Sequence, residues 1–192
     1  MKKLIVAMVV AMAAALTQAA TVSWSISGIK DSKGNDMTSG AGYVFCTKGD
    51  KATTVDAVTA ALAGKSADEV KTYLQNNSIT ALKGTIDSSK PGYIGVSGVD
   101  LASSGIPAAT TGVKIFAVII DDDSFGEDTH YVVTTASSNV KTPAASTSNN
   151  AGFSVDASAT ANSSNWTAAP EPTSGLLLLL GIAGLALKRK RA

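Results

Sequence analysis

The stretch Thr21-Val-Ser-Trp-Ser-Ile-Ser-Gly-Ile29 decides the fold class of this 192-residue chain. Val22, Trp24 and Ile26 fall on one face of an extended backbone, and serines alternate with them on the other face. A period of two is typical of a half-buried β-strand. The sequence therefore predicts a domain whose core is built on a sheet, beginning with this strand.

Further strand patterns and one pair of helix patterns follow along the chain. The additional predicted strands cover 43–47, 93–96, 113–120, 129–135 and 153–155. Helices are predicted over 55–62 and 67–75, and Ser66 and Glu69 have the spacing of a capping box at the start of the second. Strands, an inserted helical pair and more strands favour a mainly β or α+β domain with an antiparallel, β-sandwich-like sheet.

The charges are unevenly distributed. Residues 20–169 contain ten lysines, fourteen acidic residues and no arginine, a formal net charge of −4. Without arginine or a basic stripe there is no footprint for a nucleic-acid backbone, so nucleic-acid binding is excluded as a function class. The single cysteine, Cys46, cannot form an internal disulfide, and the domain must be stabilised by packing.

The N-terminal end has the three parts of a secretory signal peptide. Lys2 and Lys3 are followed by an uncharged, mostly apolar run over 4–16 and by small residues at the exit. We expect signal peptidase to cut after Ala19, with a cut after Ala20 as the alternative. A buried core helix would also fit an apolar run of this length, but its position and the lysine pair favour the signal peptide.

The C-terminal end also has three parts. Pro170, Glu171 and Pro172 form a stretch that both prolines hold extended, followed by an uncharged apolar run over 174–187. Four basic residues then end the run: Lys188, Arg189, Lys190 and Arg191. A 14-residue helix is about 21 Å long against a hydrocarbon core of about 30 Å, which suits a marginal, transient transmembrane helix. Its basic end is predicted to stay on the cytoplasmic side.

This end closely resembles the PEP-CTERM sorting signal in the order and spacing of its motif, apolar helix and basic cluster. The resemblance implies that an exosortase reads Pro170, Glu171 and Pro172, cuts near them and passes the protein to the cell surface or extracellular matrix. It also implies a Gram-negative source that makes exopolysaccharide, and a link to biofilm or floc formation. The alternative is a simple C-terminal membrane anchor.

These patterns divide the chain into four parts. We expect a signal peptide over 1–19, an exported β-rich domain over 20–156, and the sorting signal over 170–192. Serine, threonine, asparagine and alanine dominate 157–169, which favours a flexible stalk between domain and signal. Trp166, within this stalk, is a candidate for a contact at the membrane face.

The acidic run over 121–128 is the one concentration of hard oxygen ligands. The candidate calcium ligands are Asp121, Asp123, Glu127 and Asp128. An EF-hand loop is excluded because Phe125 occupies its fifth position and Val132 its twelfth. A solvated, self-repelling acidic loop is the favoured interpretation.

No catalytic constellation is visible. His130 is the only histidine and falls in a predicted strand, and Cys46 lies in an apolar stretch where it is expected to pack as a small hydrophobe. We therefore predict a protein that is not an enzyme, binds no cofactor and has a structural or adhesive role, with signal peptidase, exosortase and the membrane as partners. The rival hypotheses are a glycan-binding module, with exopolysaccharide as its ligand, and a secreted enzyme.

Overall fold

The computed structural model describes residues 19–126 and 128–169. The predicted signal helix, Glu127 and the whole of 170–192 lie outside these ranges. Within them, no helix is both long and apolar enough to cross a membrane. The sorting motif, the predicted transmembrane helix and the basic tail therefore stay predictions as far as the structure is concerned.

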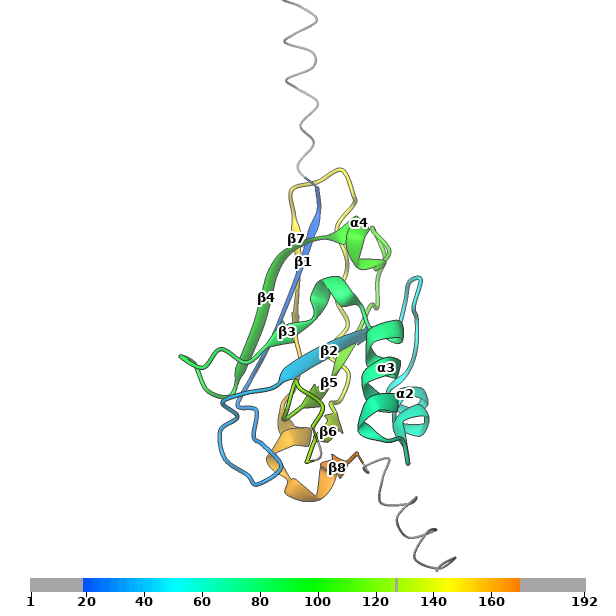
Figure 1. Ribbon diagram of the computed structural model, residues 1–192. Helices are drawn as coiled ribbons and strands as arrows, with labels where there is room; N and C mark the ends of the chain where they lie inside the picture. The colour runs from blue at the N-terminus through cyan, green and yellow to red at the C-terminus, as the bar shows by residue number, and fades with distance from the viewer. Residues whose placement is uncertain (1–18, 127, 170–192) are drawn as a thin grey trace, which may run out of the picture.

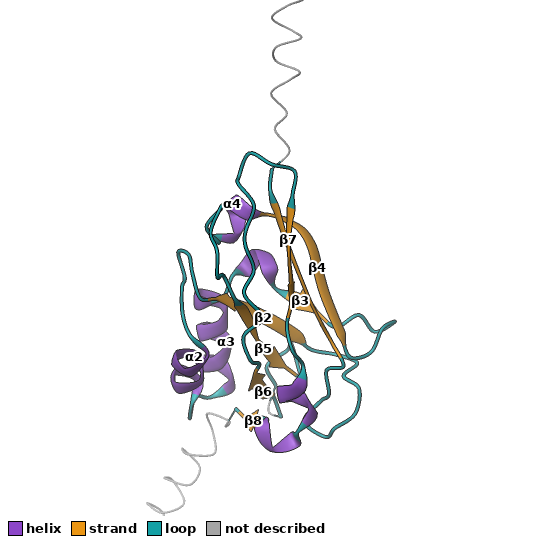
Figure 2. Ribbon diagram, turned by 180° about the vertical axis from the view of Figure 1, so that it is seen from behind, coloured by secondary structure: helices purple, strands orange, loops and turns teal. Residues whose placement is uncertain are grey.

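Two sheets and a pair of helices form three layers (Figures 1 and 2). The smaller sheet has the order β4-β1-β7 and the larger one the order β3-β2-β5-β6-β8. The smaller sheet consists of β1 (Thr21–Ser27), β4 (Tyr93–Asp100) and β7 (Asn150–Ser154). The larger consists of β2 (Ala41–Cys46), β3 (Gly84–Thr85), β5 (Ile115–Ile120), β6 (His130–Val133) and β8 (Thr167–Ala168). The expected mainly β architecture is confirmed.

One strand pairing corrects the expectation of an antiparallel arrangement. β4 pairs antiparallel with β1, as do all neighbours in the larger sheet, but β7 lies parallel to β1 from Thr21↔Asn150 to Ser25↔Ser154. β7 can run parallel because a long connection from β6 returns the chain to the other end of the molecule before the strand begins.

The space between the two sheets is the main core. Val22, Trp24 and Ile26 point into it, as their alternation predicts, and meet apolar side chains of β2 and β5. Trp24 is 2 % exposed, and its indole Nε1 donates a 2.8 Å hydrogen bond to the carbonyl oxygen of Leu82. Leu82 ends the short 3-10 helix η1 (Thr80–Leu82). Gly84 lies under this core, where a Cβ would clash with Cγ2 of Ile94.

The helical pair covers the opposite face of the larger sheet (Figure 1). α2 (Val55–Leu62) and α3 (Ala67–Asn77) pack against Phe45 and Phe116 in a second core. All residues of β2 and β5 are consequently buried, since both faces of these strands are covered. The predicted capping box is present in α3: the Ser66 side chain accepts from the backbone N–H of Glu69, and the Glu69 carboxylate accepts from the backbone N–H of Ser66.

Three further short helices complete the described chain. α4 (Leu101–Ser104) follows β4. η2 (Ser158–Ala161) and η3 (Ser163–Asn165) lie between β7 and β8. The described chain begins at one end of the molecule, beside β7, and reaches its last described residue at the other end, beside β8 (Figure 1).

The segment 157–169 differs from the predicted flexible stalk. It forms η2, η3 and β8, and Trp166 is 8 % exposed within the core between the sheets. Trp166 therefore packs inside the domain rather than presenting its ring to a membrane. The burial of Trp166 could not be predicted from its neighbours, because these small polar residues give no periodic apolar pattern. Tertiary contacts order the segment instead.

Candidate functional site: the exit of the C-terminal segment

The last described residues are the outermost strand of the larger sheet. β8 pairs antiparallel with β6 through His130↔Ala168 and Tyr131↔Thr167. The backbone N–H of Ala169 then donates a 3.0 Å hydrogen bond to the carbonyl oxygen of Thr129, and Ala169 is 2 % exposed. In the sequence, only Ala169 separates the end of β8 from the Pro-Glu-Pro triplet at 170–172.

Trp166 anchors this strand to the body of the domain. Its indole Nε1 donates a 3.2 Å hydrogen bond to the carbonyl oxygen of Thr160. Thr160 is itself fully buried, and its Oγ1 accepts a hydrogen bond from the backbone N–H of Lys30. A buried aromatic ring with a satisfied N–H gives both apolar area and a fixed orientation, so Trp166 holds the start of β8 in place.

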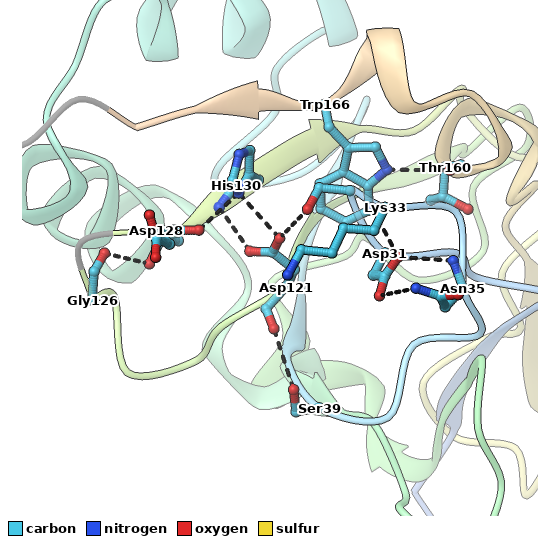
Figure 3. A network of polar contacts seen from close by, with 12 residues as sticks. Asp31, Lys33, Asn35, Ser39, Asp121, Gly126, Asp128, His130, Thr160 and Trp166 are labelled. Atoms are coloured by element: carbon cyan, nitrogen blue, oxygen red, sulfur yellow. Dashed lines mark hydrogen bonds and ion pairs between the residues drawn. The ribbon is translucent and has the colours of Figure 1, made fainter.

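His130 and Asp121 brace the start of β6 (Figure 3). The backbone N–H of His130 donates to Asp121 Oδ1 at 2.7 Å, and the ring Nδ1 lies 3.3 Å from Asp121 Oδ2 and 2.7 Å from the carbonyl oxygen of Asp128. Both neighbours of Nδ1 are acceptors, so Nδ1 is the ring nitrogen that carries a proton. His130 therefore donates a hydrogen bond through Nδ1, and this contact holds the loop that contains Asp121 and Asp128 next to β8.

The candidate calcium ligands are directed to separate partners. Asp121 accepts from His130 and from Ser32 Oγ at 2.9 Å, whereas Asp123 forms an ion pair with Lys83 Nζ at 2.9 Å. Across 19–126 and 128–169, no group of three side chains could hold a metal ion. Glu127 lies outside the described residues, and the main-chain carbonyl of Asp128 serves His130.

The described residues of the acidic run make more contacts with the domain than a solvated, self-repelling loop would. Asp121 is 14 % exposed in its side chain, and Asp122 accepts from the side chain and backbone N–H of Ser124. The hydrogen bond from the Ser124 hydroxyl lowers the pKa of Asp122. Phe125 adopts φ 58° and turns inward against Tyr43, with ring centroids 6.2 Å apart. Local hydrogen bonds and one buried aromatic ring thus offset the repulsion between carboxylates.

Cys46 lies apart from this exit. It is 1 % exposed, and its Sγ donates to the carbonyl oxygen of Lys48 at 3.0 Å. Burial raises the pKa of its thiol, which disfavours the nucleophilic thiolate. The structure therefore places Cys46 as a packed small side chain at the end of β2.

The comparisons with known proteins concern the C-terminal segment that follows β8. The family model of the PEP-CTERM protein-sorting motif matches residues 168–191. The chain is thus a protein with a C-terminal sorting signal, and the signal is of the PEP-CTERM kind, which implies export and exosortase as the processing enzyme. No curated protein and no solved structure matches the chain.

The match begins inside the folded domain. Its first residue, Ala168, is the second residue of β8, and Ala169 is bound to Thr129. The sequence pattern alone starts the signal at 170 and does not reveal the residues that hold the start of the matched segment, which are Thr129, Thr160 and Trp166. One of the contacts near this segment could be anticipated from the sequence. The predicted hairpin between 113–120 and 129–135 places Asp121 and His130 opposite one another at the ends of its strands.

Proposed function

We propose that this chain is an exported, non-enzymatic protein whose domain is displayed at the cell surface or in the extracellular matrix, where it has a structural or adhesive role. Signal peptidase removes 1–19, and exosortase cuts near Pro170, Glu171 and Pro172 while the apolar run over 174–187 holds the chain in the membrane. The match over 168–191 supports the export and processing parts of this proposal.

Two features of the fold support the processing scheme. Ala20 is 1 % exposed, and its carbonyl oxygen accepts a 2.8 Å hydrogen bond from the backbone N–H of Leu101. A cut after Ala19 keeps this residue, whereas a cut after Ala20 would remove a packed part of the core. At the other end, the described residues end at Ala169, so a cut beyond it leaves every described contact intact.

Replacing the motif tests the sorting proposal. A chain with Pro170→Ala, Glu171→Ala and Pro172→Ala keeps the domain, the apolar run and the basic tail. We expect it to accumulate in the membrane fraction of the host with its C-terminal tail attached, while the wild-type chain is processed. If the triple variant is processed and delivered like the wild type, the motif is not the recognition element. Glu171→Gln alone separates the charge of the motif from its shape.

The glycan-binding alternative is favoured by one surface feature. A groove of about 440 Å³ lies on the outer face of the smaller sheet, and Ser23, Ser25 and Tyr93 are among its lining residues. Hydroxyl groups beside an aromatic ring are a chemistry that suits sugars. Against it, Lys90 Nζ lies 3.8 Å from the centroid of the Tyr93 ring and competes for that ring. Binding of the purified domain to the host's exopolysaccharide, lost in Tyr93→Ala and kept in Tyr73→Ala, would establish this alternative.

A further inference from the structure

The first residues of the matched sorting segment are bound into the sheet. Ala168 pairs with His130, and Ala169 has its backbone N–H on the Thr129 carbonyl oxygen and is 2 % exposed. An enzyme that grips an extended chain on both sides of a motif needs the backbone and side chains of the preceding residues. While β8 is paired with β6, the backbone of the residues just before the motif is already hydrogen-bonded and cannot pair with the enzyme.

We propose that β8 is a strap that must leave β6 before exosortase can engage the residues next to Pro170. The inference deepens the proposed function: it assumes exosortase processing and adds that the fold of the substrate controls it. Processing would then draw on the fraction of molecules in which the strap is open, and the strap would close again on the domain after the cut.

The strap is built to open locally. It pairs through two residues, both exposed, and the residues on either side, Trp166 and Ala169, supply its burial. Short, exposed edge elements open at a lower free energy than the whole domain unfolds. β8 lies at the edge of its sheet, so its departure leaves the pairing of β6 with β5 in place.

A disulfide between β6 and β8 tests this directly. Because Ala169 bonds to Thr129, residues 130 and 168 form the intervening pair without mutual hydrogen bonds, the closer type in an antiparallel ladder. Its separation fits disulfide geometry. In cells that express exosortase, we expect the oxidised His130→Cys/Ala168→Cys variant to be processed at least about tenfold more slowly than the wild type, because its open state is removed.

Controls separate the strap from the side chains replaced. The single variant Ala168→Cys should be processed at close to the wild-type rate. The double variant kept reduced is the matched reference for the oxidised one, and it should be processed at least as fast as the wild type because it lacks the His130 ring that braces the loop beside β8. Trp166→Ala should be processed faster because it loosens the strap. An oxidised double variant processed at the wild-type rate would overturn the strap. If the double variant fails to fold, Trp166→Ala decides: an unchanged or slower rate overturns the proposal.

The same experiment distinguishes the strap from the sorting function. Wild-type processing that disappears in the Pro170, Glu171 and Pro172 triple alanine variant shows that the motif is read. If that triple variant is processed normally, the sorting proposal fails whatever the strap does. If the oxidised double cysteine variant is processed like the wild type while the triple alanine variant is not processed, the strap proposal fails and the sorting proposal stands.

Discussion

The backbone N–H of Ala169 donates to the carbonyl oxygen of Thr129, 40 residues earlier in the chain, at 3.0 Å. This bond makes Ala169 the last residue bound to the domain among those that the structure describes. Five residue steps separate Ala169 from Ser174, where the predicted apolar run begins, and an extended chain covers about 18 Å over that length. A free stalk over 157–169 would have added some 45 Å of reach. If the apolar run enters the membrane as proposed, the domain stays within that short reach of it.

The boundary of the domain can be tested by truncation. A chain of residues 20–156 lacks Trp166 and β8, and we expect its free energy of unfolding to fall by about 3 kcal/mol or more relative to 20–169, as for loss of a buried aromatic side chain. Urea denaturation followed by circular dichroism measures the difference. Removing only 170–192 is the control and should change the value by less than about 0.5 kcal/mol. If 20–156 and 20–169 had equal free energies of unfolding, the segment 157–169 would be a flexible stalk, as the sequence predicts.

Substitution of Trp24 should lower the free energy of unfolding by more than the change in side-chain volume alone would. Trp24→Phe keeps an aromatic ring in the core but leaves the buried carbonyl oxygen of Leu82 without its 2.8 Å donor. We expect a loss of about 1–3 kcal/mol in the free energy of unfolding. Tyr93→Phe, on the outer face of the same sheet, is the control and should cost less than about 0.5 kcal/mol. A Trp24→Phe protein as stable as the wild type would show that this hydrogen bond contributes nothing.

The capping box of α3 gives the domain one defined pH dependence. The hydrogen bond from the backbone N–H of Ser66 is the main cause that lowers the pKa of Glu69 below its ordinary 4.5. Because the folded pKa lies below the unfolded one, the stabilisation is complete above pH 4.5 and is lost as the pH falls through the folded pKa.

Glu69→Gln removes this titration. The stability difference between wild type and Glu69→Gln, measured by urea denaturation at several pH values, should be largest at neutral pH and shrink below pH 4.5. Asp68→Asn changes a carboxylate in the same helical turn outside the capping box, and its difference from wild type should be smaller. A Glu69→Gln difference that stays constant from pH 7 to pH 3 would contradict the assignment.

Two glycines without positive φ form a matched pair of sites. A Cβ at Gly84 would clash with Ile94 in the core between the sheets, whereas at Gly152 the nearest heavy atom is Asn150 Nδ2 at 4.0 Å. Gly84→Ala should destabilise the domain by about 1–3 kcal/mol through overpacking, and Gly152→Ala should be close to neutral. Thermal unfolding of the two variants measures the contrast, and equal melting temperatures would argue against the close approach at Gly84.

The parts of the fold that sequence reasoning predicted are those with a local pattern. The alternation of Val22, Trp24 and Ile26, the capping box at Ser66 and the hairpin of β5 with β6 each follow from residues close in sequence. The three-layer packing, with both faces of β5 buried, agrees with its continuous apolar run.

The parts it missed depend on contacts distant in sequence. β3 and β8 are two-residue strands defined by their partners, and β7 pairs with β1 across 129 positions at Thr21↔Asn150. Trp166 stands in a polar context that resembles a linker, and only its hydrogen bond to Thr160 and its burial show its role. Asp121 and Asp123 are neighbours in sequence, yet Asp121 contacts His130 and Asp123 contacts Lys83, so composition alone could not predict what the acidic run does.

Intact-mass analysis of the mature protein isolated from its host tests the central claim most directly. The account predicts a chain that starts at Ala20, retains Ala169 and lacks the apolar run and the basic cluster that follow the Pro-Glu-Pro triplet. A mature protein whose mass still includes the residues up to Ala192 would contradict it, since the C-terminal segment would then be a permanent anchor and no exosortase would have acted.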